Sequence, residues 1–196
     1  MKLIVIAGVA ASALLALAAC STPVSSQTPL PSSGPSSPTS SKLTAPQVPN
    51  PLDVSKFEQD PCSVLSQTQA SQVANLTTSR KTDGNVAPIC VWSDSDQNRV
   101  TFGFVPGDGL SSVYKSQDSQ SGYFQVAPEV AGYPAVFSGP HDDRNDGRCQ
   151  IGVGVRDNEV ITISATFRNP SPYYADPCSL AVKAAEAAVT TLKGGA

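Results

Sequence analysis

The second half of the chain contains a stretch in which apolar and polar residues alternate strictly. In residues 160–167 the odd positions are apolar and the even positions between them carry hydroxyl groups: Ile161, Ile163, Ala165 and Phe167 against Thr162, Ser164 and Thr166. Successive side chains of a β-strand point to opposite faces of the sheet. The pattern therefore predicts a strand with one covered face and one wet face, as an antiparallel sheet permits. A partner strand over 148–156, joined by a turn at Asp157-Asn158, completes a hairpin.

Shorter apolar stretches predict the rest of the sheet. They lie at residues 89–92, 100–104, 123–127 and 135–137, with turn-forming segments between them. The aromatic residues of the first two stretches, Trp92, Phe102 and Phe104, are most simply part of the core. From these stretches and the hairpin we expect an antiparallel sheet of about five strands, fewer than the six candidate segments.

A helix is predicted at each end of the folded region. Pro61 suits the first turn of the N-terminal helix, and Ser66-Gln67-Thr68-Gln69 has capping-box spacing for a helix to about Ala74. At the other end, Asp176 is a candidate cap for an alanine-rich amphipathic helix over 177–192. These boundaries place both helices outside the strand-forming region.

The combination of strands and helices indicates an α+β fold class. We expect one extracytoplasmic domain over residues 52–193, in which the N- and C-terminal helices pack on the antiparallel sheet. A weak helix over 110–117 is expected within the strand-forming region.

The first twenty residues follow the pattern of a secretory signal. One cation, Lys2, precedes an apolar run over 3–17, which leads into Leu17-Ala18-Ala19-Cys20. This is the form of a lipobox, in which residues 1–19 are removed and Cys20 receives a diacylglycerol. The alternative is a retained membrane helix, but no cationic stop-transfer cluster follows the run. The sequence therefore predicts a lipid anchor at Cys20 on the extracytoplasmic face of the cell membrane.

The segment after the lipobox lacks an apolar face. Residues 21–51 are almost entirely serine, threonine, proline and small residues, and Lys42 is the only charge. Such a composition cannot offset the entropy of ordering, so we expect residues 20–51 to form a disordered linker between membrane and domain. The composition also suits O-glycosylation.

The charge balance excludes one class of partner. Removal of residues 1–19 takes away Lys2, so the mature chain would carry twelve basic and sixteen acidic side chains, a net charge of −4. Mild acidity spread along the chain argues against nucleic acid, which requires a basic face. Contact with the membrane would come from the acyl chains instead.

The cysteine count is odd, and the lipobox explains it. With Cys20 acylated, four cysteines remain: Cys62, Cys90, Cys149 and Cys178. An even set in an exported chain indicates two disulfides. A metal site is the alternative, but the chain has no Cys-x-x-Cys pair and His141 is its only histidine.

Two disulfide connectivities are open. Cys62–Cys90 with Cys149–Cys178 would close short loops and join each helix to a neighbouring strand. Cys62–Cys178 with Cys90–Cys149 closes longer loops and gains at least as much by chain entropy. We favour the sequence-near pairs because short loops close first.

The sequence indicates no catalytic, cofactor-binding or metal-ligating residues. A serine hydrolase needs an exposed nucleophile and a histidine base, whereas His141 lies in a polar loop and is expected to be solvated. The acidic residues of 142–146 lack EF-hand spacing and indicate a turn. Asp94, Asp96 and Asp108 are expected to lie in turns and to be solubilising. Gly103, Gly107 and Gly109 do not form a phosphate-binding loop, since no dinucleotide-type helix follows them.

Two adjacent aromatic residues are the most suggestive contact site. Tyr173 and Tyr174 lie just before the C-terminal helix. Packing under that helix is one interpretation, and an exposed pair that contacts a partner or a sugar is the other.

Several short motifs carry a resemblance to a known family. They are the lipobox, the Ser/Thr/Pro linker, the early Pro-Cys helix start, Cys90-Val91-Trp92, Gly132-Tyr133-Pro134-Ala135, a late strand cysteine and the closing Asp-Pro-Cys helix. With them the chain resembles small actinobacterial lipoproteins of mycobacterial type, a family of unknown function, over residues 57 to 193. The resemblance implies an actinobacterial cell envelope and transfers no catalytic residue.

The functional expectation is a non-catalytic binding or accessory module of the envelope, whose partner is an envelope protein, lipid or glycan. A carrier of an apolar ligand is the first alternative and would need an internal pocket of several hundred Å³. An enzyme acting on envelope polymers is the second, and it would need a cleft with Asp or Ser groups around His141.

Overall fold

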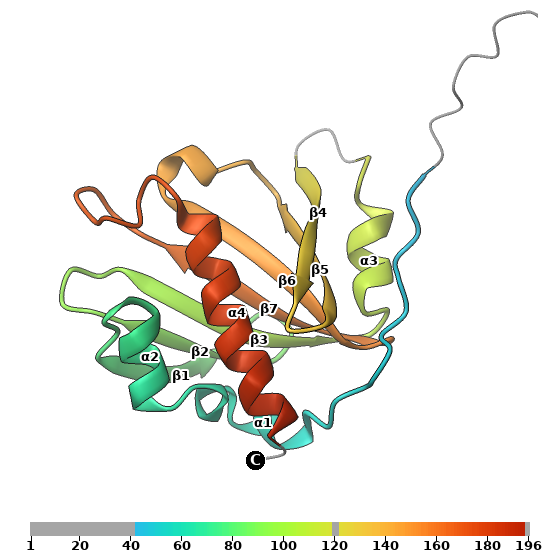
Figure 1. Ribbon diagram of the computed structural model, residues 1–196, viewed down its shortest axis with the longest axis horizontal. Helices are drawn as coiled ribbons and strands as arrows, with labels where there is room; N and C mark the ends of the chain where they lie inside the picture. The colour runs from blue at the N-terminus through green and yellow to red at the C-terminus, as the bar shows by residue number, and fades with distance from the viewer. Residues whose placement is uncertain (1–41, 119–121, 195–196) are drawn as a thin grey trace, which may run out of the picture. The chain divides into compact units, whose positions relative to one another are not determined.

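Seven antiparallel strands form one sheet in the order β1-β2-β3-β7-β6-β5-β4 (Figure 1). The computed structural model describes residues 42–118 and 122–194, so the predictions for the signal peptide, for Cys20 and for most of the linker lie outside the described residues. The strands are β1 (Thr78–Asp83), β2 (Pro88–Ser93), β3 (Arg99–Pro106), β4 (Tyr123–Val130), β5 (Tyr133–Gly139), β6 (Arg148–Arg156) and β7 (Glu159–Thr166). The α+β class and the antiparallel sheet are confirmed, but the sheet has seven strands and not five.

Within residues 42–118 and 122–194, four α-helices and two short 3-10 helices accompany the sheet. They are α1 (Ser55–Gln59), η1 (Pro61–Val64), α2 (Gln67–Ala74), α3 (Leu110–Lys115), η2 (Arg144–Asp146) and α4 (Pro177–Lys193). In the described residues, no helix is both long and apolar enough to cross a membrane.

The strand that the hydrophobic pattern missed is β1. It has no apolar residue, and nearly all of it is exposed. As an edge strand it is held by its backbone ladder to β2 and not by burial. Its charged Arg80 and Lys81 also discourage pairing with a second chain. Alternation of apolar and polar residues could not reveal a strand that buries neither face.

The main core lies between the sheet and α4. This helix crosses β6 and β7 and presents a buried stripe of small residues to them: Ala181, Ala184, Ala185 and Ala188. Ile161 and Ile163 of β7, from the covered face that the alternation predicts, are fully buried. Because alanine has a short side chain, the helix backbone can lie close to the sheet.

The predicted capping box is present at the start of α2. The Ser66 backbone N–H donates to Oε1 of Gln69 at 2.8 Å, and the Gln69 N–H donates to Oγ of Ser66 at 3.2 Å. Nε2 of Gln69 also donates to Oγ1 of Thr191 at 3.0 Å, which ties α2 to α4. The N-terminal region contacts the sheet through α1 and η1, whereas α2 packs on α4.

Residues 42–51, which the sequence assigns to the linker, run along the domain. Val48 is buried, and its N–H donates to Oδ1 of Asp157 at 2.8 Å. The hydroxyl of Tyr133 donates to the carbonyl oxygen of Asn50 at 2.8 Å. These contacts fix the segment that leads into α1.

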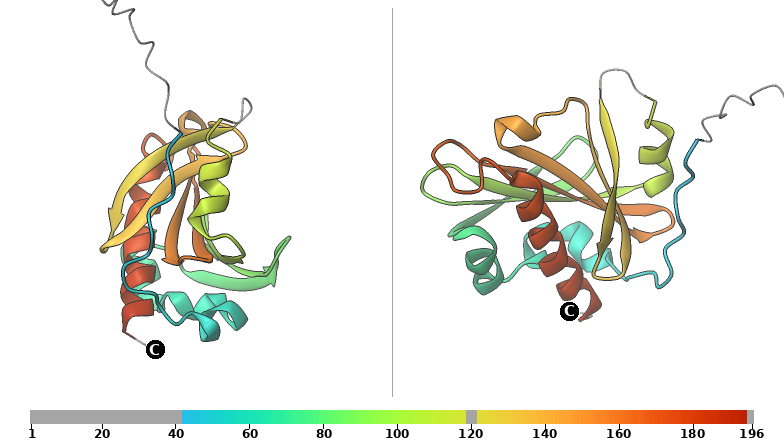
Figure 2. Two further views of the ribbon diagram at one scale, coloured as in Figure 1. Left: turned by 90° about the vertical axis from the view of Figure 1, so that its right-hand side faces the viewer. Right: turned by 45° about the horizontal axis from the view of Figure 1, so that its top comes forward.

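The opposite side of the sheet is covered only in part by a described helix, α3. Leu110 and Tyr114 of this helix pack against Val136 and Val160 in a second, smaller apolar cluster. Figure 2 shows α3 and α4 on opposite sides of the sheet. Gly109 precedes α3 and has φ of +55°. Glycine is needed there because a Cβ would collide with the backbone of the β6–β7 turn.

Two disulfides join the elements. They link Cys62 of η1 to Cys90 of β2, and Cys149 of β6 to Cys178 of α4. These are the sequence-near pairs, and each fastens a helical segment to a strand beneath it. The second bond lies at the N-terminal end of α4 and holds that end on β6.

Loss of the second disulfide should destabilise the domain measurably. The bond closes a loop with a sequence separation of 29, for which chain entropy gives about 3.6 kcal/mol. We expect the double variant Cys149→Ala/Cys178→Ala to lose about that much unfolding free energy in urea denaturation. The double variant Cys62→Ala/Cys90→Ala, with a separation of 28, is the matched comparison. A loss below about 1 kcal/mol in both would contradict the chain-entropy estimate.

A carboxyl group is buried where α1 meets the sheet. Glu159, at the start of β7, is 3% exposed, and its Oε1 has no hydrogen-bond partner. Burial, and next the hydrogen bond and negative charge of Glu58, raise the pKa of Glu159 to about 7. Arg156, at 3.3 Å from Oε2, opposes this shift, and it also pairs with Asp53.

Stability should fall as Glu159 ionises. Its folded pKa lies above the ordinary value of 4.5, so the protonated form stabilises the fold at low pH. That stabilisation is complete below about pH 4.5 and is lost as the pH rises through about 7. We expect the unfolding free energy to drop by about 1–3 kcal/mol across this range in urea titrations. Glu159→Gln should remove this slope, whereas Glu186→Gln on the exposed side of α4 should keep it; a wild-type slope in Glu159→Gln would refute the assignment.

Candidate functional site

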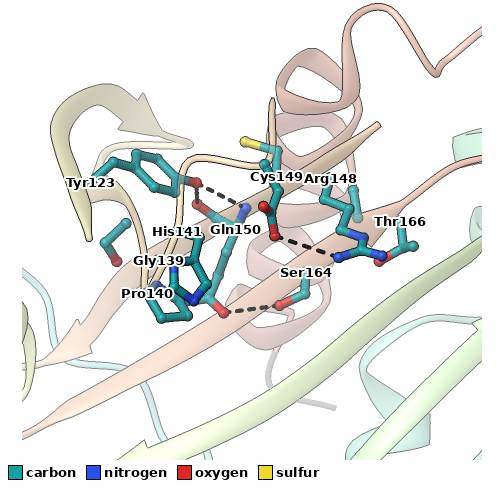
Figure 3. Close-up of a pocket in the computed structure, with 12 residues that line it drawn as sticks. Tyr123, Gly139, Pro140, His141, Arg148, Cys149, Gln150, Ser164 and Thr166 are labelled. Carbon is teal, nitrogen blue, oxygen red and sulfur yellow. Dashed lines mark hydrogen bonds and ion pairs between the residues drawn. The ribbon is translucent and has the colours of Figure 1, made fainter. Parts of the chain in front are cut away.

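A cleft opens where β5 and β6 separate. The two strands pair only between Ala135–Phe137 and Ile151–Val153 and diverge beyond Phe137. The resulting cleft has a volume of about 160 Å³ and is lined by both polar and apolar residues (Figure 3). Its polar lining comprises Tyr123, Ser138, His141, Asp143, Arg148, Gln150, Ser164 and Thr166. We call it the β5–β6 cleft.

Tyr123 of β4 bridges the gap between the diverging strands. Its hydroxyl accepts from the Gln150 N–H and donates to the Gln150 carbonyl oxygen, both at 3.4 Å (Figure 3). The ring crosses over Gly139, which has no Cβ. A Cβ at this position would lie only 2.7 Å from Cε1 of Tyr123, so a larger residue would displace the ring. Burial raises the pKa of the phenol, so it stays neutral and can both donate and accept. Gln150 pairs with Ser164 of β7 but lies beyond the last residue pair of β5 and β6. The hydroxyl of Tyr123 thus takes the place of a β5 backbone partner for Gln150.

The acidic loop beside the cleft is organised by an arginine. Nε and Nη2 of Arg144 each donate to the Asp142 carboxylate at 2.7 Å, and these hydrogen bonds lower the pKa of Asp142. Nη1 of Arg144 donates to Oε1 of Gln125 at 2.8 Å, and its guanidinium lies 4.8 Å from the centre of the Tyr123 ring. The hydrogen bonds and the ion pair of Arg144 therefore hold the loop in a fixed turn. Among the described residues, no three His, Cys, Asp or Glu side chains gather closely enough to hold a metal ion.

The cleft brings His141 together with possible catalytic partners. Asp143, Ser138 and Ser164 line the same space. However, Oγ of Ser164 donates to Oε1 of Gln150 at 3.1 Å, and Asp143 faces Arg148 at 3.5 Å. Within residues 42–118 and 122–194, no hydrogen bond joins His141 to a serine or a carboxylate. The nucleophile–base contact of a hydrolase is thus not formed in this structure.

The cleft is continuous with a wider surface on the same side of the sheet. Strand register places two rows of side chains there: Thr78, Ser93, Arg99, Thr166 and Arg148 in one, and Arg80, Val91, Thr101, Ser164 and Gln150 in the other. All ten are exposed or half-buried. The hydroxyl oxygens of Thr78 and Ser93 lie 3.1 Å apart, as expected for neighbours in a row. We call these ten residues the polar face.

The remaining candidate residues have structural roles. Tyr173 packs edge to face on Phe167 with ring centres 5.2 Å apart, and Tyr174 packs over Gly147, where a Cβ would collide with its ring. Both tyrosines are half-buried. Their contact with a partner stays a prediction.

The acids and glycines of the turns also serve the fold. Asp94 accepts hydrogen bonds from the N–H groups of Asp96 and Asn98, and Asp108 pairs with Lys115. Gly103 lies on β3, within the strand predicted over 100–104, and Gly107 is a turn residue with φ of +131°.

The sequence motifs missed the residues that form this site. Tyr123, Gln150 and the three arginines of the polar face belong to no motif, and register across five strands brings most of them together. The alternation in residues 160–167 did place Ser164 and Thr166 on the wet face.

The fold and site define a class: a disulfide-bonded α+β domain with a seven-stranded antiparallel sheet, one face covered by a helix and the other partly open. The chain belongs to the family described as a protein of unknown function, DUF3558, which matches residues 15–191. No curated protein and no solved structure matches the chain.

The hydroxyl of Tyr123 should protect the Gln150 amide. Tyr123→Phe keeps the ring and removes the oxygen, so we expect exchange of the Gln150 amide hydrogen to accelerate about tenfold or more, with about 1 kcal/mol of stability lost. Hydrogen exchange followed by NMR measures both. Tyr173→Phe, which keeps the stack on Phe167, should leave the Gln150 amide unchanged. Unchanged protection in Tyr123→Phe would exclude the bridging role.

Proposed function

We propose that this protein is a lipid-anchored, non-catalytic binding module of an actinobacterial cell envelope, with its ligand site on the polar face and in the β5–β6 cleft. The open polar face, continuous with a cleft, is the observation that carries the proposal. A sheet that needs only one covered face for stability can leave the other for recognition.

Two sequence features support the proposed location. Leu17-Ala18-Ala19-Cys20 has the form of a lipobox, and the disulfides of the domain are typical of oxidising compartments. An anchored domain meets polymers and proteins of the envelope directly, and its ligand would be selected by the groups of the polar face.

The chemistry of the site favours recognition over transport of an apolar ligand. The cleft of about 160 Å³ is smaller than the several hundred Å³ expected for a carrier. The larger hollows of the described residues, about 330 to 510 Å³, are grooves open to solvent and not internal pockets. The hydroxyl and amide groups along the polar face suit a hydrogen-bonding ligand, whereas a lipid would need an apolar lining.

An enzyme acting on envelope polymers is the second candidate. The gathering of His141, Asp143 and two serines in one cleft is the observation that favours it. Two of these groups are engaged elsewhere, Ser164 with Gln150 and Asp143 with Arg148. Binding that persists in His141→Ala, without cleavage of the bound polymer by the wild-type protein, would favour the binding module.

The test is to fill the proposed site without changing its charge. Labelled soluble glycan fragments from the cell envelope are titrated with the full chain, and binding is followed by fluorescence anisotropy. Ser164→Trp, in the middle of the polar face, should weaken binding at least about tenfold through steric exclusion. Thr190→Trp, at an exposed position of α4, should bind like wild type. Equal binding by the two variants, with equal melting temperatures, would overturn the proposed site.

A further inference from the structure

The polar face carries positive charge on an acidic protein. The chain has thirteen basic and sixteen acidic side chains. Yet the ten residues of the polar face include Arg80, Arg99 and Arg148 and no acid. Two acids, Asp94 and Asp143, lie at its border. A local concentration of one charge sign, against the net charge of the protein, creates a potential that attracts ligands of the opposite sign.

The arginines are spaced across the sheet. Arg99 and Arg148 share a row and are separated by β7, which places their Cα atoms about 10 Å apart at the usual strand spacing. Arg80 lies on β1, four strand spacings or about 19 Å from β6. The charges therefore form an extended line and not a pocket for one small anion.

The charges are largely free to bind. Among the described residues, Arg80 and Arg99 have no carboxylate within 4.0 Å, and all three arginines are exposed. Arg148 has a single contact of 3.5 Å with Asp143, and such exposed pairs are weak. The nearby Asp94 already accepts hydrogen bonds from the turn that it closes.

Hydrogen-bonding groups occupy the spaces between the charges. The two rows supply hydroxyl groups from Thr78, Ser93, Thr101, Ser164 and Thr166, and an amide from Gln150. Arginine binds oxyanions with paired N–H donors, and hydroxyl and amide groups both donate and accept. A ligand that matches both sets is a chain of hydroxylated units with regularly placed anionic groups.

We propose that the polar face binds an acidic polysaccharide, with its arginines on the carboxylate or phosphate groups and its hydroxyl and amide side chains on the sugar hydroxyls. This inference rests on the proposed function and names the ligand class for the same site. An acidic peptide fits less well, because extended peptides join a sheet through the backbone of an edge strand, whereas these groups project from the face.

The experiment compares two variants of equal charge. The full chain is titrated with fluorescent polygalacturonate at low salt. The triple variant Arg80→Gln/Arg99→Gln/Arg148→Gln should weaken binding at least about thirtyfold, since all three oxyanion contacts are removed. The control, Lys56→Gln/Lys81→Gln/Lys183→Gln, removes three exposed cations outside the polar face and should bind within about twofold of wild type. Binding should also weaken as salt rises, and neutral dextran should not bind.

The outcomes separate this inference from the proposed function. Equal weakening by both triple variants would mean that net charge, and not the polar face, attracts the polymer, and would overturn the inference. Tighter binding of poly-glutamate than of polygalacturonate would also overturn it in favour of an acidic peptide. Loss of envelope glycan binding in Ser164→Trp but not in the arginine variant would support the proposed ligand site and refute the inference that its ligand is an acidic polysaccharide. If neither variant affects binding, both proposals fail.

Discussion

The close packing of α4 on β6 and β7 is the constraint on which the rest of the structure depends. A stripe of alanines lets this long helix lie near the sheet, and the Cys149–Cys178 bond holds its first turn on β6. The helix buries the apolar positions of the central strands, and α2 in turn packs on it. Because this one layer covers most of the core, the opposite side of the sheet is released from the need to be apolar.

Because the side of the sheet away from α4 need not be apolar, it can carry the polar face and the β5–β6 cleft. Away from the small apolar cluster under α3, the side chains of the polar face are hydroxyls, one amide and arginines, with Val91 the exception. Such groups tolerate solvent and can bind a polar ligand. The cleft arises at the same side, where β5 leaves β6 and the hydroxyl of Tyr123 takes over the strand contact of Gln150. Gly139 is required there because any side chain would occupy the path of the Tyr123 ring. The polar face and the cleft thus follow from one covered face and one interrupted strand pair.

The engaged state of the polar groups favours binding over catalysis. In the cleft, two of the potential catalytic groups contact other protein groups, Ser164 with Gln150 and Asp143 with Arg148. Along the polar face, by contrast, Arg80 and Arg99 are exposed and have no carboxylate partner among the described residues. Groups that are prepositioned and unpaired are suited to a ligand that brings the missing charge.

The sequence by itself determined the elements that depend on local pattern. The alternation in β7, the capping box of α2 and the Asp176 cap of α4 were all predicted, because burial and capping leave a periodic or positional signal. The edge strand β1 buries neither face, so it left no such signal and only its pairing with β2 reveals it. The site was likewise decided by tertiary structure: Arg80, Arg99 and Arg148 are far apart in the chain, and the register of five strands alone brings them onto one face. A register is a property of pairs of strands, and no single segment of the sequence carries it.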